Sequence, residues 1–295
     1  GAGSDHAEVM ALKNLFADLG ATTLPNGYTA VVTLEPCNHQ GRTGPCSQAL
    51  IEAGISKVVF ASSDPGDASS NGSQRLREAG VEVISGVMLS KAEDQGRVWL
   101  TANRKKRPFV ILKWASSLDG KTAAQDGTSQ WISGPESRAN SHELRSKVEA
   151  ILVGTGTAIA DDPELTARKP DGSYYQDQPL RVALGERDLP GSLKLFNDQA
   201  KTIQIRTREV SDALQELWSI GVKSVLVEGG PKVASEFMKS GLVDEVIVYL
   251  APMLLGGNNA SLSDIGVQSM PDAVELEIVE NKMLGKDLYL RARRA

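Results

Sequence analysis

Apolar residues along the chain alternate between the spacing of a helix and that of a strand. From His6 to about Gly20 they recur at helical spacing, and Gly20 supplies a helix end. Residues 28–34 form a short apolar run rich in β-branched side chains, which predicts a buried strand. Further strands are predicted at 57–61, 81–84, 109–114, 150–153, 180–184, 202–205, 222–227, 246–249, 274–279 and 287–292. Further helices are predicted from 46 onward and at 73–79, 90–103, 133–148, 211–220 and 231–241.

This alternation of strands and helices favours an α/β fold throughout the chain. A chain of 295 residues is long for one hydrophobic core and comfortable for two. The basic run Arg104-Lys105-Lys106-Arg107, followed by Pro108, separates two such halves. We interpret this run as a solvated linker, and we predict two domains, residues 1–106 and residues 107–295.

Charge and composition exclude several classes of protein. The 32 basic and 37 acidic residues give a net charge of −5, which argues against broad nucleic-acid binding. No stretch of roughly 18 apolar residues predicts a membrane span, and no signal sequence is recognisable. Two cysteines do not make a disulfide framework, so a reducing cytoplasm is the expected location.

Histidine and cysteine residues in the first half have the pattern of a zinc site. His6 lies two residues before Glu8, and Cys37 and Cys46 flank the loop after the predicted strand 28–34. A catalytic zinc takes three protein ligands and leaves its fourth position to water. His6, Cys37 and Cys46 provide such a set. Glu8 is then available to move a proton between the water and a departing amine, as in zinc deaminases.

Two other interpretations of these residues stay open. A closed structural zinc site would take His39 as its fourth ligand, and a Cys37–Cys46 disulfide would need no metal; both leave Glu8 without a task. Polynucleotide deaminases have two residues between their cysteines, whereas eight separate them here. The loop also carries Arg42, which suits phosphate or carboxylate binding. We therefore expect a small anionic substrate rather than a base within a polynucleotide.

The second half has glycine-rich turns after its predicted strands. Gly154-Thr155-Gly156 begins a dinucleotide fingerprint, but the third small residue would fall on Ile159, so the motif fails. Glu228-Gly229-Gly230-Pro231 lies between a strand and a helix, where free N–H groups favour phosphate, although an ordinary tight turn is also compatible. Asp161-Asp162-Pro163 with the nearby Arg168 is compatible with catalysis or with a capped turn.

Longer motifs make both halves resemble a known family. PCNHQGRTGPC with an upstream HAE resembles the bifunctional riboflavin-biosynthesis deaminase/reductases. Five stretches of the second half follow the order of the reductase part of that family. They are LKWASSLDGKTA, SQWISGPESR, GTGTAIADDPELTAR, VLVEGGP and GLVDEVIVYLAPMLLGG. The resemblance implies a cytidine-deaminase-like domain followed by a dihydrofolate-reductase-like domain.

The resemblance also implies roles for individual residues. It places zinc on His6, Cys37 and Cys46, with Glu8 as the proton shuttle and the loop from His39 to Arg42 against the substrate. It implies NADPH contacts from Ala115, Trp131, Thr157, Asp161, Gly230, Pro231, Lys232, Val233, Ala234, Ser235 and Glu236. It implies contacts to the reductase substrate from Ser129, Arg145, Leu165, Arg168 and Glu228, and catalysis by Asp161 and Lys113. Arg145 and Arg168 suit a phosphate clamp.

In the family, a helix, two strands and a Pro-Asn-Pro segment precede the HAE motif. Here His6 is almost the first residue. A sheet without those strands would expose an apolar edge, so we expect about forty further residues to belong before Gly1.

Taken together, the sequence predicts zinc-dependent deamination of a phosphoribosylamino-diaminopyrimidinone, followed by NADPH-dependent reduction of the ribosyl to a ribityl chain. One alternative is a reductase with an inactive deaminase domain. Another is a non-catalytic nucleotide-binding module with structural zinc, and a free-cytidine deaminase fits less well. We expect a small-molecule partner, no nucleic acid or membrane, and a homodimer or higher homo-oligomer.

Overall fold

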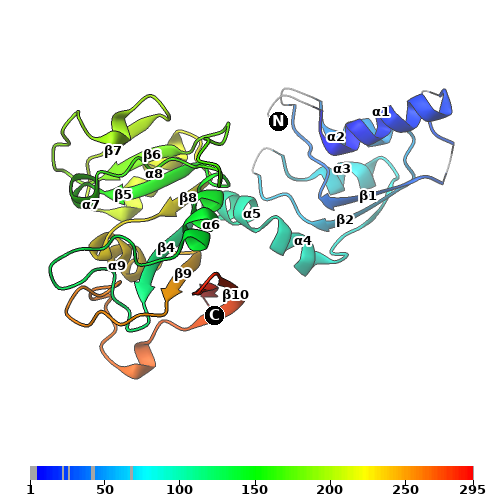
Figure 1. The fold of residues 1–295 in the computed structure, drawn as a ribbon. Coiled ribbons are helices and arrows are strands. Elements are labelled where there is room, and N and C mark those ends of the chain that lie inside the picture. Colours follow the sequence, from blue (N-terminus) through cyan, green and yellow to red (C-terminus); the bar gives the residue numbers. More distant parts are fainter. Residues whose placement is uncertain (1–4, 22, 26, 41–43, 67–68, 295) are drawn as a thin grey trace. The chain divides into compact units, whose positions relative to one another are not determined.

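The computed structural model describes residues 5–21, 23–25, 27–40, 44–66 and 69–294. The chain forms two compact units, divided between Lys105 and Lys106 (Figure 1). This division falls one residue before the boundary that the basic run predicts. None of the helices described here is long and apolar enough to cross a membrane.

The first unit is a small parallel sheet covered by helices. Its strand order is β1-β2-β3, and both strand pairs are parallel. The strands are β1 (Thr29–Leu34), β2 (Lys57–Ser62) and β3 (Glu82–Ile84). The helices are α1 (Ala7–Leu19), α2 (Cys46–Glu52), α3 (Gly72–Glu78), α4 (Leu89–Gln95) and α5 (Arg97–Lys105). Leu12, Leu50 and Leu76 bring α1, α2 and α3 into one apolar core with the strands.

The two helices nearest the cysteine loop begin where the sequence predicts. His6 occupies the extended N-cap position of α1, and Gly20 ends that helix in the left-handed conformation with φ 61°. Cys46 is the first residue of α2, directly after Pro45. His6 and Cys46 therefore lie at helix starts, while Cys37 lies in the loop that follows β1.

A buried carboxylate and a glycine hold the loop that carries Cys37. The carboxylate of Glu35 is buried and accepts a hydrogen bond of 2.8 Å from the backbone N–H of Ser73 in α3. Gly72, the first residue of α3, lies directly against Pro36, where an added Cβ would be 1.7 Å from the carbonyl oxygen. Glycine alone allows this approach, so the start of α3 determines where Cys37 is placed.

The second unit contains an eight-stranded sheet with the order β10-β11-β9-β4-β8-β5-β6-β7. The six strands from β9 to β7 are parallel, and β11 and β10 add an antiparallel hairpin beside β9. The strands are β4 (Phe109–Ser117), β5 (Ala150–Gly154), β6 (Leu180–Leu184), β7 (Thr202–Ile205), β8 (Ser224–Val227), β9 (Glu245–Ala251), β10 (Leu276–Leu284) and β11 (Asp287–Arg294).

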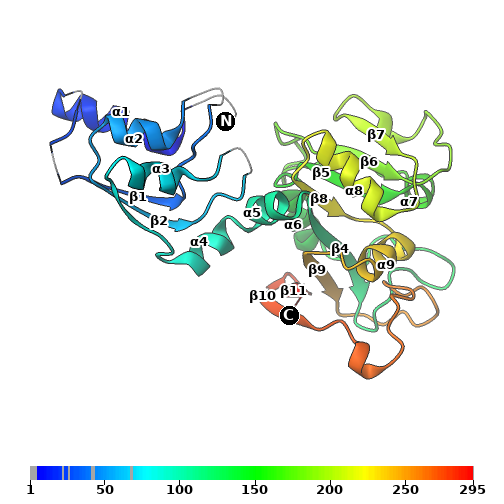
Figure 2. The same cartoon turned by 180° about the vertical axis from the view of Figure 1, so that it is seen from behind.

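Helices cover both faces of this sheet (Figure 2). They are α6 (Pro135–Arg145), α7 (Thr155–Asp161), α8 (Val210–Ser219) and α9 (Pro231–Lys239), with short 3-10 turns at Lys194–Phe196 and Met270–Asp272. Leu152 in β5 packs into the core formed with α8 and α9, whereas its neighbour Ile151 packs into the core on the other face. Alternate side chains of one strand are thus buried on opposite faces, which explains the unbroken apolar runs.

The basic run before the second unit is not a solvated linker, so that prediction is wrong. Arg104 and Lys105 lie in α5, and Arg107 is buried. The guanidinium of Arg107 donates hydrogen bonds of 2.6 and 2.9 Å to the carboxylate of Asp244. The partner lies 137 residues away, so no local pattern could have revealed this ion pair.

Two helices also differ from the prediction. The helix expected at 90–103 is divided into α4 and α5, because Gly96 ends the first of them. Residues 155–161, for which the sequence predicted no helix, form α7. Glycine is a poor helix former, but burial of Thr155 and Ala158 against the sheet favours the helix in this place.

The close contact at Gly72 leads to a prediction. Replacement of Gly72 by Ala should destabilise the first unit by about 1–3 kcal/mol and weaken zinc binding, because the new Cβ would push the Pro36 backbone, and Cys37 with it. The melting temperature and competition for zinc with a chromophoric chelator measure the two effects.

Gly44→Ala is the matched control, since a Cβ there meets no described atom within 4 Å. Unchanged zinc affinity and melting in Gly72→Ala would contradict the role given to this contact.

Candidate active sites

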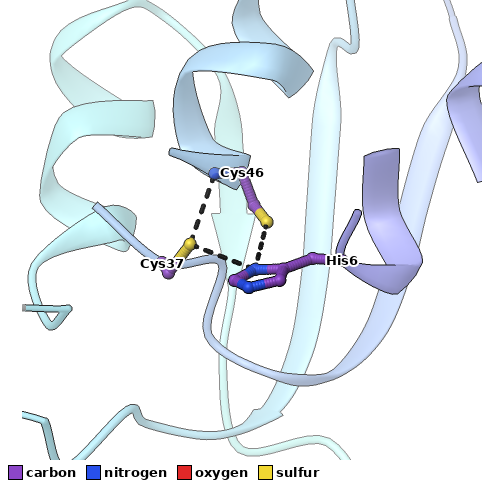
Figure 3. Close-up of side chains that lie close together, drawn as sticks. All are labelled: His6, Cys37 and Cys46. Carbon is purple, nitrogen blue, oxygen red and sulfur yellow. Dashed lines mark hydrogen bonds between the residues drawn. The ribbon is translucent and has the colours of Figure 1, made fainter. Parts of the chain in front are cut away.

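His6, Cys37 and Cys46 bring their ligand atoms together in the first unit, within 4.8 Å of one another. The Nδ1 atom of His6 lies 3.1 Å from Sγ of Cys46 and 3.5 Å from Sγ of Cys37 (Figure 3). Zinc bonds of ~2.3 Å to sulfur and ~2.0 Å to nitrogen place tetrahedral ligand atoms roughly 3.5 Å apart. The three residues therefore fit zinc in size, geometry and ligand type.

The two cysteines are free and buried, so the disulfide interpretation is wrong for this structure. The hydrogen bond from the Cys46 thiol lowers the pKa of Cys37 to about 5, and the backbone N–H of Cys46 also donates to the Cys37 sulfur at 3.4 Å. The same interaction with Cys37, together with burial, raises the pKa of Cys46. Zinc binds cysteine as the thiolate, so binding of the metal to this pair would release protons.

Glu8 lies beside this cluster rather than in it. Its Oε2 atom lies 3.6 Å from Sγ of Cys46. His39 is not part of the metal-binding group found among the described residues, which weighs against a closed site with four protein ligands. Its ring is half-buried, and Nδ1 has no hydrogen-bond partner in the described part of the chain. Arg42, which the sequence also places against the substrate, lies outside the described residues.

Sequence reasoning did not single out Asn38 and Arg75, which support the cysteine loop. The side-chain oxygen of Asn38 accepts hydrogen bonds from Ser47 in α2 and from Arg75 in α3, both at 3.2 Å. Arg75 also donates to Gln48 at 2.6 Å. These contacts join three separate segments, so only their spatial arrangement reveals them.

The second unit has a cavity of about 770 Å³, here called the Arg145 cavity. It gathers nine of the predicted site residues. These are Lys113, Ala115, Ser129, Trp131, Arg145, Asp161, Leu165, Arg168 and Glu228. They come from β4, from α6, from the loop after α7 and from the end of β8, so the cavity lies at the carboxyl end of the parallel strands.

Glu228 forms the charged centre of this cavity. Its carboxylate accepts hydrogen bonds of 2.8 and 2.9 Å from Arg145, and the ammonium of Lys113 lies 3.5 Å away. Burial alone would raise the pKa of Glu228, but Arg145 and Lys113 outweigh it and hold this pKa far below its usual range. Burial lowers the pKa of Lys113 despite the nearby carboxylate.

This pairing engages part of the Arg145 guanidinium. Its Nη1 atom donates to the carbonyl of Thr166 at 3.1 Å, in addition to the two hydrogen bonds to Glu228. Three of its five N–H donors are thus engaged, which leaves two for the phosphate that the sequence assigned to Arg145. Arg168 pairs with Glu164 and stacks on Tyr174 at 5.6 Å.

The segment after α7 bends sharply into the cavity. Asp162 and Leu165 both have positive φ, 40° and 51°, which is rare for residues other than glycine. The side chain of Leu165 is buried, whereas Asp161 is exposed at the end of the helix. Partial burial raises the pKa of Asp161. Such strain is concentrated at functional sites, and here it aims Asp161 and Arg168 toward the same space.

His142 is a further residue of the Arg145 cavity. The ring is half-buried in the last turn of α6, and Nδ1 donates to the carbonyl of Thr166 at 3.0 Å. Burial and the charge of Arg145 lower its pKa, which favours the neutral ring. The sequence could have indicated this residue, because its spacing from Arg145 places both side chains on one face of the helix.

A second cavity of about 810 Å³, here called the glycine-loop cavity, lies at the carboxyl ends of β5, β6 and β8. Five of the residues predicted to contact NADPH line it: Thr157, Gly230, Pro231, Lys232 and Val233. The backbone N–H of Gly230 donates to Thr157 at 3.1 Å, which joins the starts of α7 and α9.

Three predicted cofactor contacts on α9 line neither cavity. Ala234 and Ser235 are buried inside α9, where Ala234 belongs to the apolar core and Ser235 accepts a hydrogen bond from Ser263 at 2.7 Å. Glu236 is exposed on the same helix. The helix turns these side chains away from the loop, so only its first turn faces the cavity.

Comparison with known proteins connects both units to one family. Residues 2–62 match the cytidine and deoxycytidylate deaminase zinc-binding region, and residues 108–290 match the RibD C-terminal domain. The riboflavin biosynthesis protein RibD of Mycobacterium tuberculosis is 44% identical over 290 residues, which cover 98% of this chain and 83% of the relative. The chain belongs to the RibD family of bifunctional deaminase/reductases.

Solved structures of RibD proteins have the same fold over the whole chain. RibD of Acinetobacter baumannii has a TM-score of 0.86 and 33% identity, covering 100% of this chain and 86% of that one. A Thermotoga maritima protein has a TM-score of 0.81 and 33% identity, covering 99% and 86%. It is named as a diaminohydroxyphosphoribosylaminopyrimidine deaminase/5-amino-6-(5-phosphoribosylamino)uracil reductase. The family confirms the prediction of a zinc deaminase domain joined to a dihydrofolate-reductase-like domain.

The charged centre of the RibD reductase domain leads to a prediction about stability and pH. Glu228→Gln should lower the free energy of unfolding by about 3–5 kcal/mol at neutral pH, because Arg145 and Lys113 lose their buried counter-charge. A depressed pKa in the folded state means that the carboxylate stabilises the protein above its ordinary pKa of 4.5, and that this stabilisation is lost as pH falls below that value. The gap between variant and wild type should therefore narrow in acid.

Urea unfolding followed by tryptophan fluorescence at several pH values measures this gap. Glu143→Gln, which removes an exposed partner of Lys147, is the control and should cost less than about 1 kcal/mol. A difference in the free energy of unfolding that stays constant at acid pH would contradict the role given to the Glu228 carboxylate.

Proposed function

We propose that the first domain removes an amino group from a phosphoribosylamino-diaminopyrimidinone by hydrolysis. We further propose that the second domain reduces the ribosyl chain of the product to ribityl with NADPH. The substrate class is the one in the name of the Thermotoga maritima relative. The observation that carries the proposal is the cluster of His6, Cys37 and Cys46, which provides three zinc ligands with the Glu8 carboxylate beside them.

The residues of the first domain divide the work of deamination. Zinc, when bound to His6, Cys37 and Cys46, supplies a Lewis acid that makes a water molecule acidic enough to react at neutral pH. Glu8 takes a proton from that water and returns it to the departing amine, so ammonia leaves as a neutral molecule. His39 has an unpartnered ring nitrogen among the described residues, which suits a polar substrate group.

The residues of the Arg145 cavity suit the reduction. NADPH, when bound, supplies the hydride, and the cavity holds the sugar that receives it. Asp161 stands at the cavity wall with a carboxylate that can stabilise positive charge developing on an imine, and Arg168 is placed to meet a phosphate. Lys113, in contact with Glu228, provides a second candidate for proton transfer. The neighbouring glycine-loop cavity is large enough for a dinucleotide and lies at the starts of α7 and α9, and helix starts favour phosphate.

Two variants test the assignment of deamination to the first domain and of reduction to the second, and each serves as the control for the other. Glu8→Gln should lower the rate of ammonia release by roughly 10²- to 10⁴-fold while zinc content and NADPH oxidation on deaminated substrate stay unchanged. Asp161→Asn should lower NADPH oxidation by about a hundredfold and leave ammonia release intact. Ammonia and NADPH are followed separately in one coupled assay, and zinc is measured by atomic absorption.

Deamination that survives in Glu8→Gln would show that Glu8 is not the proton shuttle. Equal loss of both activities in either variant would point to misfolding instead. Wild-type protein that oxidises NADPH only when deaminated substrate is supplied would favour a reductase with an inactive deaminase domain.

We propose also that the chain pairs through β10. This strand bonds β11 on one side, and among the described residues its other edge has no partner strand. Ile278 and Met283 on β10 are 56% and 61% exposed, which is an unusual state for an edge strand unless another chain covers it.

Sedimentation tests this pairing. Wild type should sediment as a dimer or larger assembly, and Ile278→Lys should sediment as a smaller species, because a charge on the edge opposes pairing. Met270→Lys, at an 85% exposed position outside the sheet, is the control and should leave the mass unchanged. A monomeric wild type, or a variant with unchanged mass, would contradict the proposal.

A further inference from the structure

The strand order of the reductase sheet indicates how a dinucleotide would be oriented in the glycine-loop cavity. The Arg145 cavity lies at the ends of β9, β4 and β8, and the glycine-loop cavity continues past β5 to β6. Figure 1 shows β5, β6 and β7 following one another at this side of the sheet. A dinucleotide whose reactive ring meets the substrate in the Arg145 cavity must therefore place its adenosine half near β6 and β7.

Basic side chains gather at that far end. Arg187 follows β6, Arg208 follows β7, and both line the glycine-loop cavity together with Lys232. The only acidic residue lining it in the described part of the chain is Glu186, so the lining charges sum to +2. The pyrophosphate of a dinucleotide is expected at the glycine loops, near Lys232, which leaves Arg187 and Arg208 for a further anionic group.

The two arginines have N–H donors available. Among the described residues, the guanidinium of Arg187 makes no hydrogen bond or ion pair, and it lies over the first turn of α7, near Gly156. Arg208 donates from Nε to Glu186 at 3.0 Å, and its two terminal nitrogens donate to no described residue. A guanidinium fork matches the oxygen atoms of a phosphate, to which it can donate two parallel hydrogen bonds.

The pairing of Glu186 bears on the choice between the two nicotinamide dinucleotides. In NAD sites an acidic residue accepts a hydrogen bond from the 2′-hydroxyl of the adenosine ribose, whereas in NADP sites a nearby arginine binds the 2′-phosphate. Here the carboxylate of Glu186 is held by Arg208, so it serves to orient that arginine.

We propose that Arg187 and Arg208 bind the adenosine 2′-phosphate and thereby make the reductase domain select NADPH over NADH. This inference rests on the proposed NADPH-dependent reduction, and it assigns the choice of cofactor to two residues beyond those that the family resemblance implies.

Binding of cofactor fragments tests the proposal without catalysis. Calorimetry with 2′,5′-ADP and 5′-AMP, and fluorescence titration with NADPH and NADH, would be compared in wild type, Arg187→Gln and Arg208→Gln. Each variant should bind 2′,5′-ADP and NADPH roughly ten- to hundredfold more weakly, as expected for a lost hydrogen bond between charged groups. Binding of 5′-AMP and NADH should be unchanged.

Arg206→Gln is the matched control. Arg206 also follows β7 and pairs with Asp188 at 2.8 Å, but it does not line the cavity. It should bind all four ligands as wild type does.

The outcomes separate the inference from the proposed function. A wild type that binds NADPH and NADH equally, or variants that keep a full preference for NADPH, would overturn the role of the two arginines and leave the reduction standing. Equal loss of all four ligands would mark a structural role and also overturn it. A wild type that binds neither dinucleotide would overturn the proposed reduction, and the inference with it.

Discussion

Parallel strands all end at the same edge of a sheet, and both halves of this protein are organised by that constraint. A polar side chain inside either sheet would lose its water without a partner, whereas the loops at the carboxyl ends are open to ligands. In the first unit the loop after β1 carries Cys37. In the second unit, the end of β8 carries Glu228 and the end of β5 leads directly into α7. In each unit the strand ends themselves form the cleft, so no additional element is required for it.

The charges at these strand ends are held in two different ways. In the reductase domain Glu228, Arg145 and Lys113 form a buried set whose members pair with one another, which favours the ionised form of Glu228 and places all three side chains at one cavity. In the deaminase domain the two cysteines bind a metal as thiolates, so the charge of the site depends on whether the metal is bound. The first arrangement is a fixed scaffold, and the second is a site whose charge changes when it is filled.

The order of the strands also relates one cavity to the next within the reductase domain. β4 and β8 bound the Arg145 cavity, and β5, β6 and β7 follow in sequence beside them. A long ligand can therefore run across the strand ends, with its reactive part over Lys113 and its far part near Arg187. The fold thus offers positions for two ligands along one edge, and the side chains at each strand end decide which chemical group is recognised there.

The amino-acid sequence by itself determined the α/β class, the bounds of most strands and the three zinc ligands, because these depend on local periodicity and on motifs a few residues long. It also indicated Glu228, Arg168 and Gly230 through their family motifs. Only the tertiary structure showed that Arg107 pairs with Asp244, that Arg145 is engaged by Glu228, and that Arg187 and Arg208 face one cavity. The physical reason is that partners far apart in sequence meet only after the sheet is assembled, so the charge that a side chain finds beside it is a property of the fold.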